Sequence, residues 1–213
     1  MSYIIAIIAA LALPTAEVEV GVHNRQTKFG EIEHDGAVGS VEGEIGMYGL
    51  SFDWEWIFDG HGGRELTLGP GYFHTFEGDL KAGFKYLFER HPERIEEPTQ
   101  FAVPSVECDC LLHPTLEWWL DTDRNRWSSY WSADIGHSFD APFGTRLDLS
   151  AGAGLSDMAR LCFKDMHARA ALDIPVCRHL SVVPYIGLVH RFNHHDAGCD
   201  CILCTGAALA MNY

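Results

Sequence analysis

The chain has 213 residues, 47% of them hydrophobic, so it is long enough to form one sizeable domain. Its formal net charge of -15 disfavours a nucleic-acid partner, because binding to phosphates needs a basic face. The same acidity argues against peripheral attachment to a membrane through basic residues. No apolar run reaches the length of about 20 residues that a transmembrane helix needs.

Residues 1–16 differ in composition from the rest of the chain. Ile4 to Leu13 is an unbroken apolar run, and Pro14, Thr15 and Ala16 follow it. This pattern predicts a secretory signal peptide at 1–16, cleaved near Ala16, although no Lys or Arg precedes the run. The alternative is a buried N-terminal strand or helix. We expect residues 17–213 to form a single β-barrel domain, since no further boundary is visible.

Apolar and polar residues alternate along most of the chain after the leader, which predicts a series of β-strands. Residues 79–89 also fit a helical face, but the strands on either side favour a strand there. Pro70 predicts a bulge or a local break in pairing. The predicted strands cover residues 18–23, 38–45, 50–58, 65–76, 79–89, 101–110, 115–120, 127–139, 145–155, 165–175, 181–192 and 205–213.

The hairpin at 115–139 shows the alternation most clearly. Leu116, Trp118 and Leu120 share one face of its first strand, and Trp131 and Ile135 share one face of its second. In a soluble sandwich this apolar face would need a second sheet to cover it. In an outer-membrane barrel the bilayer covers it and the polar face lines the lumen.

The connections between the predicted strands favour the barrel. Long polar connectors at 24–36, 90–99 and 193–201 follow odd-numbered strands, whereas short ones, such as the tight turn at 46–49, follow even-numbered strands. Transmembrane barrels show this alternation of long loops and short turns. An even strand count would also place both termini on the short-turn side.

The aromatic residues have two interpretations. They either pack in a core or form girdles at the two membrane interfaces. The set is Trp54, Trp56, Trp118, Trp127, Trp131, Phe139 and Tyr213.

The C-terminal half resembles known outer-membrane proteins. The final strand ends on Tyr213 with Met211 and Leu209 on the same face, which is similar to the C-terminal signature of bacterial outer-membrane proteins. Residues 112–213 also resemble a porin-like group of uncharacterised Gram-negative outer-membrane β-barrel proteins. The matching pieces are Pro114-Thr115-Leu116-Glu117, Asp121-Thr122-Asp123, Tyr130-Trp131, Gly136-His137-Ser138-Phe139 and Val183-Pro184-Tyr185-Ile186-Gly187.

Together with the twelve predicted strands, this resemblance implies an all-β fold, an antiparallel up-and-down transmembrane β-barrel of about 12 strands, located in the bacterial outer membrane. It implies fold more than activity. The cysteines of this chain depart from the group, so the resemblance leaves the role of the loops open.

In such a barrel the polar face of each strand lines the lumen. An acidic wall concentrates cations, so we expect a narrow, cation-preferring, porin-like channel for small solutes, with the lipid bilayer as its surroundings. A plugged barrel, with charges paired across its interior, is the alternative, because twelve strands enclose a modest lumen. The predicted lumen-lining residues are Glu17, Glu19, Glu42, Glu44, Asp53, Glu55, Lys81, Lys85, Glu117, Asp121, Asp134, Arg146, Asp148, Arg169 and Asp173.

The seven cysteines suggest a second hypothesis. An oxidising compartment would favour disulfides, and an odd count leaves at least one thiol over if all pairing is internal. The spacing of the candidate ligands is only a weak match to known metal-site motifs, so the sequence predicts no cofactor. A closed barrel acting as a surface binding or structural protein, with a Zn²⁺ or Cu site in the loop 193–204, stays open. Its candidate ligands are His194, His195, Cys199, Cys201 and Cys204.

An outer-membrane lipid-modifying enzyme is the third hypothesis. No nucleophile elbow, P-loop or zinc-protease motif is present in the sequence. His137 and Ser138 are adjacent in a strand and therefore point to opposite faces, so His137 cannot activate Ser138. We expect no enzyme, and a Ser and a His on one face of adjacent strands would be needed to favour one.

Overall fold

The computed structural model describes residues 15–28, 31–60, 63–76, 79–92, 98–123, 129–156, 162–192 and 199–212. None of these residues forms a helix long and apolar enough to cross a membrane. The described elements are β1 (Thr15–Lys28), β2 (Glu31–Met47), β3 (Leu50–Asp59), β4 (Arg64–Thr75), β5 (Leu80–Arg90), β6 (Thr99–Cys108), β7 (Thr115–Asp121), β8 (Ser129–Asp140), the 3-10 turn η1 (Pro142–Gly144), β9 (Arg146–Ser156), β10 (Cys162–Cys177), β11 (Leu180–Phe192) and β12 (Cys199–Asn212).

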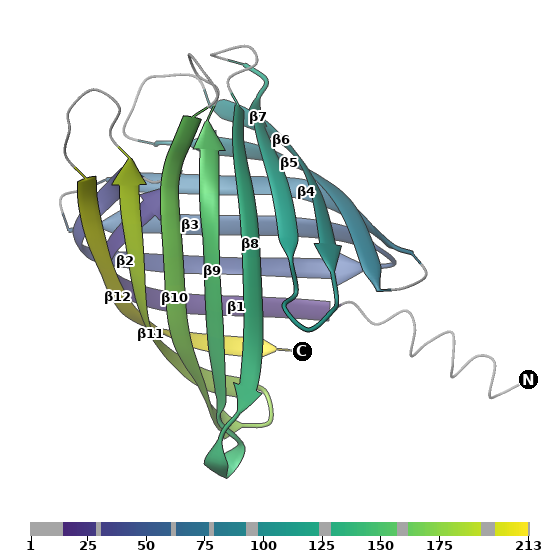
Figure 1. The fold of residues 1–213 in the computed structure, drawn as a ribbon, viewed down its shortest axis with the longest axis vertical. Coiled ribbons are helices and arrows are strands. Elements are labelled where there is room, and N and C mark those ends of the chain that lie inside the picture. Colours follow the sequence, from purple (N-terminus) through teal and green to yellow (C-terminus); the bar gives the residue numbers. More distant parts are fainter. Residues whose placement is uncertain are drawn as a thin grey trace, which may run out of the picture.

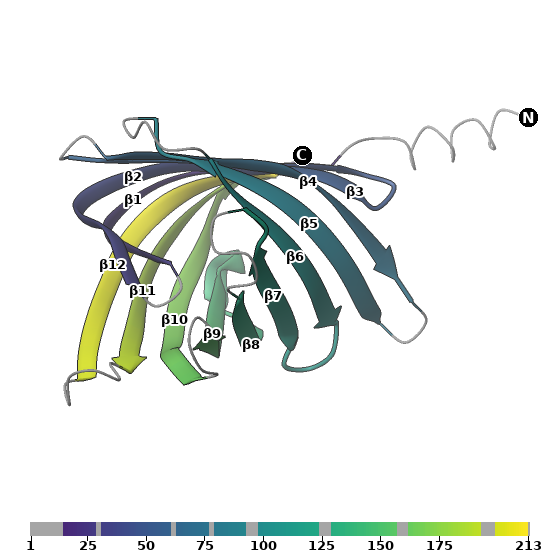
Figure 2. The ribbon, with the colours of Figure 1, turned by 90° about the horizontal axis from the view of Figure 1, so that it is seen from above.

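The twelve strands form one closed antiparallel barrel in which each strand pairs with its neighbours in sequence and β1 pairs with β12 (Figures 1 and 2). This confirms the predicted up-and-down barrel of about twelve strands. The predicted signal peptide is not tested, because residues 1–14 lie outside the described part of the chain. The cleavage site and the domain boundary at residue 17 therefore stay predictions.

The two ends of the barrel sheet lie at the same rim. Glu17 near the start of β1 is in register with Asn212 at the end of β12, as an even number of strands requires. Connectors that follow even-numbered strands, such as 48–49 and 178–179, lie at this rim, which we call the turn rim. Connectors that follow odd-numbered strands lie at the opposite rim, which we call the loop rim.

The structure contradicts the predicted loop at 24–36. β1 continues to Lys28 and β2 begins at Glu31, so only residues 29–30 separate them. The backbone of residues 25–28 still pairs with β2, whereas the register of β1 with β12 ends at His23 and Gly206. The Asn24 side chain accepts a hydrogen bond from the Thr205 amide (2.6 Å) and donates one to the Leu203 carbonyl (3.2 Å), which joins β1 to β12.

Two local predictions are confirmed. The tight turn between β2 and β3 consists of Tyr48 and Gly49, which both have positive φ angles of 55° and 81°. Two-residue hairpins favour this backbone because its twist matches that of the strands. At Pro70, the pairing of β4 with β5 is interrupted between Leu68 and Gly71, as expected for a residue without an amide hydrogen.

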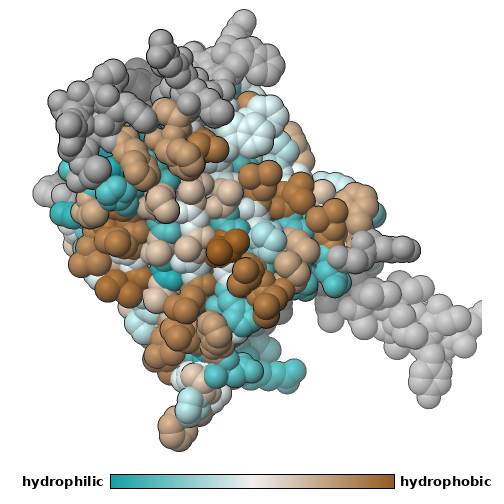
Figure 3. Space-filling model, in the orientation of Figure 1, coloured by the Kyte–Doolittle hydropathy of each residue, from teal (hydrophilic) through white to brown (hydrophobic). Residues whose placement is uncertain are grey.

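The outside of the barrel is strongly apolar. Large apolar side chains remain exposed on every strand, and Figure 3 shows them spread over the face formed by β8–β10. Soluble monomers rarely expose an apolar surface of this extent, whereas a membrane-spanning barrel covers it with lipid. The exposed residues include Val20, Ile45, Phe52, Trp56, Tyr72, Phe84, Val106, Leu116, Ile135, Leu149, Met166, Ile186 and Leu203.

Two aromatic residues of the predicted girdle contact each other. The indoles of Trp118 and Trp131 stack with their ring centres 4.6 Å apart, and Trp56 meets Phe58, a residue outside the predicted set, edge-on. Trp127 and Tyr213 lie outside the described residues. The girdle role therefore stays a prediction.

Candidate functional site

The interior of the barrel is the candidate functional site, because the strands turn their charged faces toward it. Glu42, Glu55 and Lys85 line one interior cavity, and Arg146, Asp148 and Asp173 line another part of the interior wall. Each predicted lumen residue belongs to the inward-facing set of its strand. The remaining members of that set are Glu17, Glu19, Glu44, Asp53, Lys81, Glu117, Asp121, Asp134 and Arg169.

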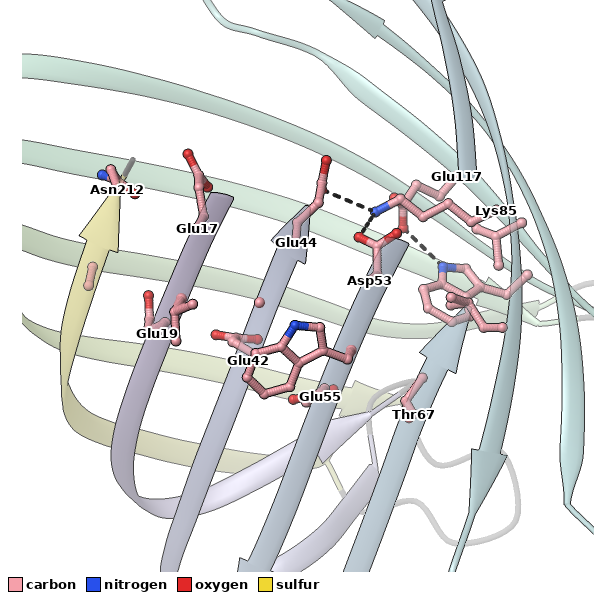
Figure 4. Close-up of a pocket in the computed structure, with 17 residues that line it drawn as sticks. Glu17, Glu19, Glu42, Glu44, Asp53, Glu55, Thr67, Lys85, Glu117 and Asn212 are labelled. Carbon is pink, nitrogen blue, oxygen red and sulfur yellow. Dashed lines mark hydrogen bonds and ion pairs between the residues drawn. The ribbon is translucent and has the colours of Figure 1, made fainter. Parts of the chain in front are cut away.

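Six of these carboxylates form an array on β1, β2 and β3, which we call the acidic wall (Figure 4). The register brings them into two cross-strand rows. The row nearer the turn rim is Glu17, Glu44 and Asp53; the row nearer the loop rim is Glu19, Glu42 and Glu55. Like charges directly opposite each other on neighbouring strands are destabilising, so this arrangement opposes folding rather than supporting it.

Lys85 on β5 faces the row nearer the turn rim. Its ammonium nitrogen lies 2.6 Å from an Asp53 carboxylate oxygen and 3.9 Å from a Glu44 carboxylate oxygen. Figure 4 shows both contacts, with Glu117 close behind. The Glu117 carboxylate itself accepts a hydrogen bond of 3.0 Å from the Trp119 indole. One lysine therefore offsets part of the repulsion in this row.

Two cavities meet at the row nearer the loop rim. The turn-side cavity, of about 350 Å³, is lined by both rows of the acidic wall and by Lys85. The loop-side cavity, of about 370 Å³, is lined by Arg25, His167 and Arg169 among others. Both include Glu19, Glu42 and Glu55 in their lining. Any solute that passed from one cavity to the other would pass these three carboxylates.

Basic side chains face the interior from other strands. Arg169 on β10 places its guanidinium 4.3 Å from the centre of the Tyr185 ring. Arg146 on β9 forms ion pairs with Asp148 (3.0 Å) and Asp173 (3.3 Å). Arg146 is therefore paired on its own part of the wall, whereas Arg169 also attracts Glu19 and Glu42 of the acidic wall electrostatically.

A polar network joins side chains of β8 to side chains of β10 across the intervening strand β9. His167 on β10 lies 2.6 Å from Asp134 on β8 and 3.0 Å from Asp165 on its own strand, and Tyr130 donates a hydrogen bond of 2.9 Å to Asp165. β9 lies between these partners and presents Gly152 and Gly154 to the interior. A Cβ atom at Gly152 would collide with Asp134 and His167, and one at Gly154 would collide with Tyr130 and Asp165.

Tyr130, Asp165 and His167 were not among the predicted lumen-lining residues. All three share the inward face of their strands with predicted lumen residues, and that alternation was the available signal. It could not show that they meet, because the contact spans a whole intervening strand.

The interior is more tightly packed toward the loop rim. Val38 and Ile57 are almost fully buried there, as are Glu65 and Asp165. Toward the turn rim, in contrast, the Arg146 side chain keeps 52% of its surface exposed. An apolar cluster of Leu87, Phe101 and Val103, with Trp119 against it, also faces the interior, which the alternation did not predict.

The structure brings one histidine and one serine together on adjacent strands. His23 on β1 lies 2.7 Å from the Ser40 hydroxyl on β2, and its other ring nitrogen contacts the Tyr185 hydroxyl. Ser40 is only 3% exposed and faces the barrel interior, not the bilayer. The third group is a phenol rather than the carboxylate that orients the base in a Ser-His-Asp triad.

His137 and Ser138 face opposite sides of β8, as predicted. The His137 ring contacts the Leu111 carbonyl at 2.6 Å, and Ser138 donates a hydrogen bond to Asp148 on the inner face. These two residues therefore do not form a nucleophile and base.

The structure corrects the loop assumed for 193–204 in the alternative of a metal-binding site. β12 begins at Cys199, so the second half of this segment is strand. Cys201 is exposed on the outside, where its sulfur lies 3.2 Å from His190, whereas Cys204 is buried on the inside. Residues three apart in a strand face opposite sides, so Cys201 and Cys204 cannot bind one ion. His194 and His195 lie outside the described residues.

The cysteines whose side chains the structure describes are all free thiols. They are Cys108, Cys110, Cys162, Cys177, Cys201 and Cys204. No disulfide therefore closes a connector between any two of them.

No model of a known protein family matches this chain, and no curated protein matches it in sequence. Among solved structures, the chain is similar to the KdgM porin in complex with disordered oligogalacturonate, with a TM-score of 0.58 and 7% identity over 93% of this chain and 98% of that chain. It is also similar to the COG4313 outer membrane channel from Pseudomonas putida F1, with a TM-score of 0.54 and 8% identity over 95% of this chain and 96% of that chain. The chain therefore has the fold of outer-membrane porin barrels.

Proposed function

We propose that this protein lies in a bacterial outer membrane and forms a narrow, porin-like passage for small solutes that prefers cations. The acidic wall is the observation that carries this proposal. Six carboxylates in two rows border the interior cavities, and one of the rows is shared by both cavities. The turn-side cavity is lined by seven carboxylates and one lysine. A cleft in which charge of one sign dominates raises the local concentration of counter-ions, by about tenfold or more.

The cost of the acidic wall supports a functional role. Glu42 lies directly opposite Glu19 and Glu55 on the neighbouring strands, and like charges in such pairs oppose folding. Gln or Ser would fill the same inward positions without this repulsion. The carboxylates are therefore better explained by the solutes they attract than by the stability of the barrel.

The same wall limits the substrate class. The matched KdgM porin was solved with an oligogalacturonate, which is a polyanion. Glu19, Glu42 and Glu55 would repel a polyanion at the junction of the two cavities. Small cations and neutral solutes fit this interior better.

Conductance across a planar bilayer tests the proposal. We expect discrete steps in current from the purified chain and a reversal potential in a KCl gradient that shows preference for K⁺ over Cl⁻. The preference should weaken near 1 M salt, where the Debye length falls to about 3 Å and the carboxylates are screened. A band shift on boiling in gel electrophoresis would verify beforehand that the barrel is folded.

Two results would contradict the proposal in different ways. A folded barrel that gives no current above that of the empty bilayer would exclude the channel and favour a closed barrel that binds a partner at its surface. Current with preference for Cl⁻ would keep the channel but exclude the cation preference.

The contact between His23 and Ser40 allows a test of the enzyme hypothesis. We expect no covalent labelling of the folded chain by a fluorophosphonate probe, because Ser40 is buried and the third group is Tyr185. Ser40→Ala serves as the matched control, and a known serine hydrolase shows that the probe is active. Labelling that disappears in both Ser40→Ala and His23→Ala would instead support a hydrolase.

A further inference from the structure

We propose that Glu65, Glu89 and His91 form a binding site for one divalent transition-metal ion on the inner wall near the loop rim. This site is separate from the acidic wall and goes beyond the proposed channel. It takes no ligand from the segment 193–204, which holds the candidate ligands of the alternative hypothesis.

The register of β4 and β5 brings the three side chains together. Leu66 pairs with Arg90, which places Glu65 opposite His91, and Thr67 pairs with Glu89 at the next inward position. The possible ligand atoms of Glu65, Glu89 and His91 all lie within 4.8 Å of one another. Atoms at such separations can contact one ion, since metal–ligand distances are about 2.0–2.2 Å for zinc with nitrogen or oxygen ligands.

Burial distinguishes this cluster from the acidic wall. Glu65 is 1% exposed and Glu89 is 6% exposed, whereas Glu44 of the acidic wall keeps 45% of its side chain exposed. Water and mobile ions screen the exposed carboxylates, but they screen buried ones far less. Two buried carboxylates side by side therefore attract a divalent ion placed between them more strongly than exposed carboxylates would.

The neighbouring groups suit a metal site. His91 Nε2 lies 3.4 Å from the Glu89 carboxylate, so one imidazole nitrogen already points at the cluster. Thr67 donates a hydrogen bond of 3.4 Å to Glu65, which restrains the orientation of that carboxylate. Hydrogen bonds of this kind to a ligating carboxylate hold it in place for the metal.

The ligand types select the class of metal. One imidazole and two carboxylates suit Zn²⁺ and its first-row neighbours, whereas Ca²⁺ takes six to eight oxygen ligands. His91 follows directly after β5 ends at Arg90. A bound ion would therefore tie the start of the β5–β6 connector to the wall of β4.

Zinc binding to the folded, chelator-treated chain tests the proposal, with excess Mg²⁺ present to occupy weak sites on the acidic wall. We expect one tight equivalent of Zn²⁺ in the wild type and at least about tenfold weaker binding in Glu89→Gln and in His91→Asn. Glu107→Gln is the matched control, because Glu107 is an inner-wall carboxylate paired with Lys81 instead. Binding in that variant should equal wild type.

A second control tests whether the cysteine thiols, rather than this site, bind the zinc ion. A variant with Cys199, Cys201 and Cys204 changed to Ser should keep the tight equivalent. Zinc should also raise the unfolding temperature of the wild type but not that of His91→Asn, because an ion that binds only the folded state stabilises it. His91 lies outside the strand, so its variant should fold even if Glu89→Gln does not.

Three outcomes would overturn the proposal. They are the absence of a tight equivalent in the wild type, its loss in the cysteine variant alone, and its retention in both Glu89→Gln and His91→Asn. None of these outcomes would affect the channel proposal, which is tested by conductance.

Discussion

Replacement of Glu42 and Glu55 by lysine is expected to change the selectivity of the passage from cations to anions. These residues lie directly opposite each other on β2 and β3 and line both cavities. The change replaces two negative charges by two positive ones at the junction through which ions would pass. We expect the ratio of K⁺ to Cl⁻ permeability to fall by about tenfold or more and to drop below unity.

The matched controls separate local charge from net charge. Glu42→Gln with Glu55→Gln should reduce the cation preference without reversing it, and the loss of repulsion with Glu19 should leave folding intact. Asp109 is an exposed connector residue at the turn rim. Asp109→Lys changes the charge by as much as one of the two lysine substitutions does, and it should have little effect on the selectivity. Unchanged selectivity in the double lysine variant would show that ions do not pass the acidic wall.

Gly154→Leu is expected to destabilise the barrel strongly. A side chain at this position would occupy the space in which Tyr130 on β8 reaches Asp165 on β10. Overpacking costs about 1–3 kcal/mol. Loss of a hydrogen bond to a charged group costs about 1.5–3 kcal/mol more. Here Asp165, which is only 1% exposed, would lose the hydrogen bond from Tyr130. We expect a loss of about 2.5–6 kcal/mol in the free energy of unfolding.

Ala153→Leu is the matched control for this variant. Ala153 is the neighbouring residue of β9, points outward, and is in register with Ala133 and Met166. The same leucine placed there would face the bilayer, so the variant should fold like the wild type. Heat-modifiability on gels and thermal unfolding followed by circular dichroism would measure both variants. Equal stability of Gly154→Leu and the wild type would show that the network across β9 does not hold the barrel together.

Local patterns were sufficient to predict most of the strands and the barrel. The alternation at 115–139 predicted both strands of the hairpin, and the turn at Tyr48 and Gly49 and the break at Pro70 follow from backbone chemistry. Alternation failed at 24–36, because polar residues on both faces looked like a loop. There the strand is completed by Asn24 bonding to β12, which is far away in the sequence.

By itself, the sequence determined which face each side chain takes, because neighbouring residues of a strand point to opposite sides. That rule is local, and it placed Glu42, Asp134 and Arg169 on the inward faces of their strands. Only the tertiary structure decided which inward groups meet. The register set Glu42 against Glu19 and Glu55, the glycines of β9 let His167 reach Asp134, and the pairing of β4 with β5 brought Glu65 to Glu89 and His91. These contacts depend on register and barrel closure, which join residues distant in the chain, and no short stretch of sequence encodes them.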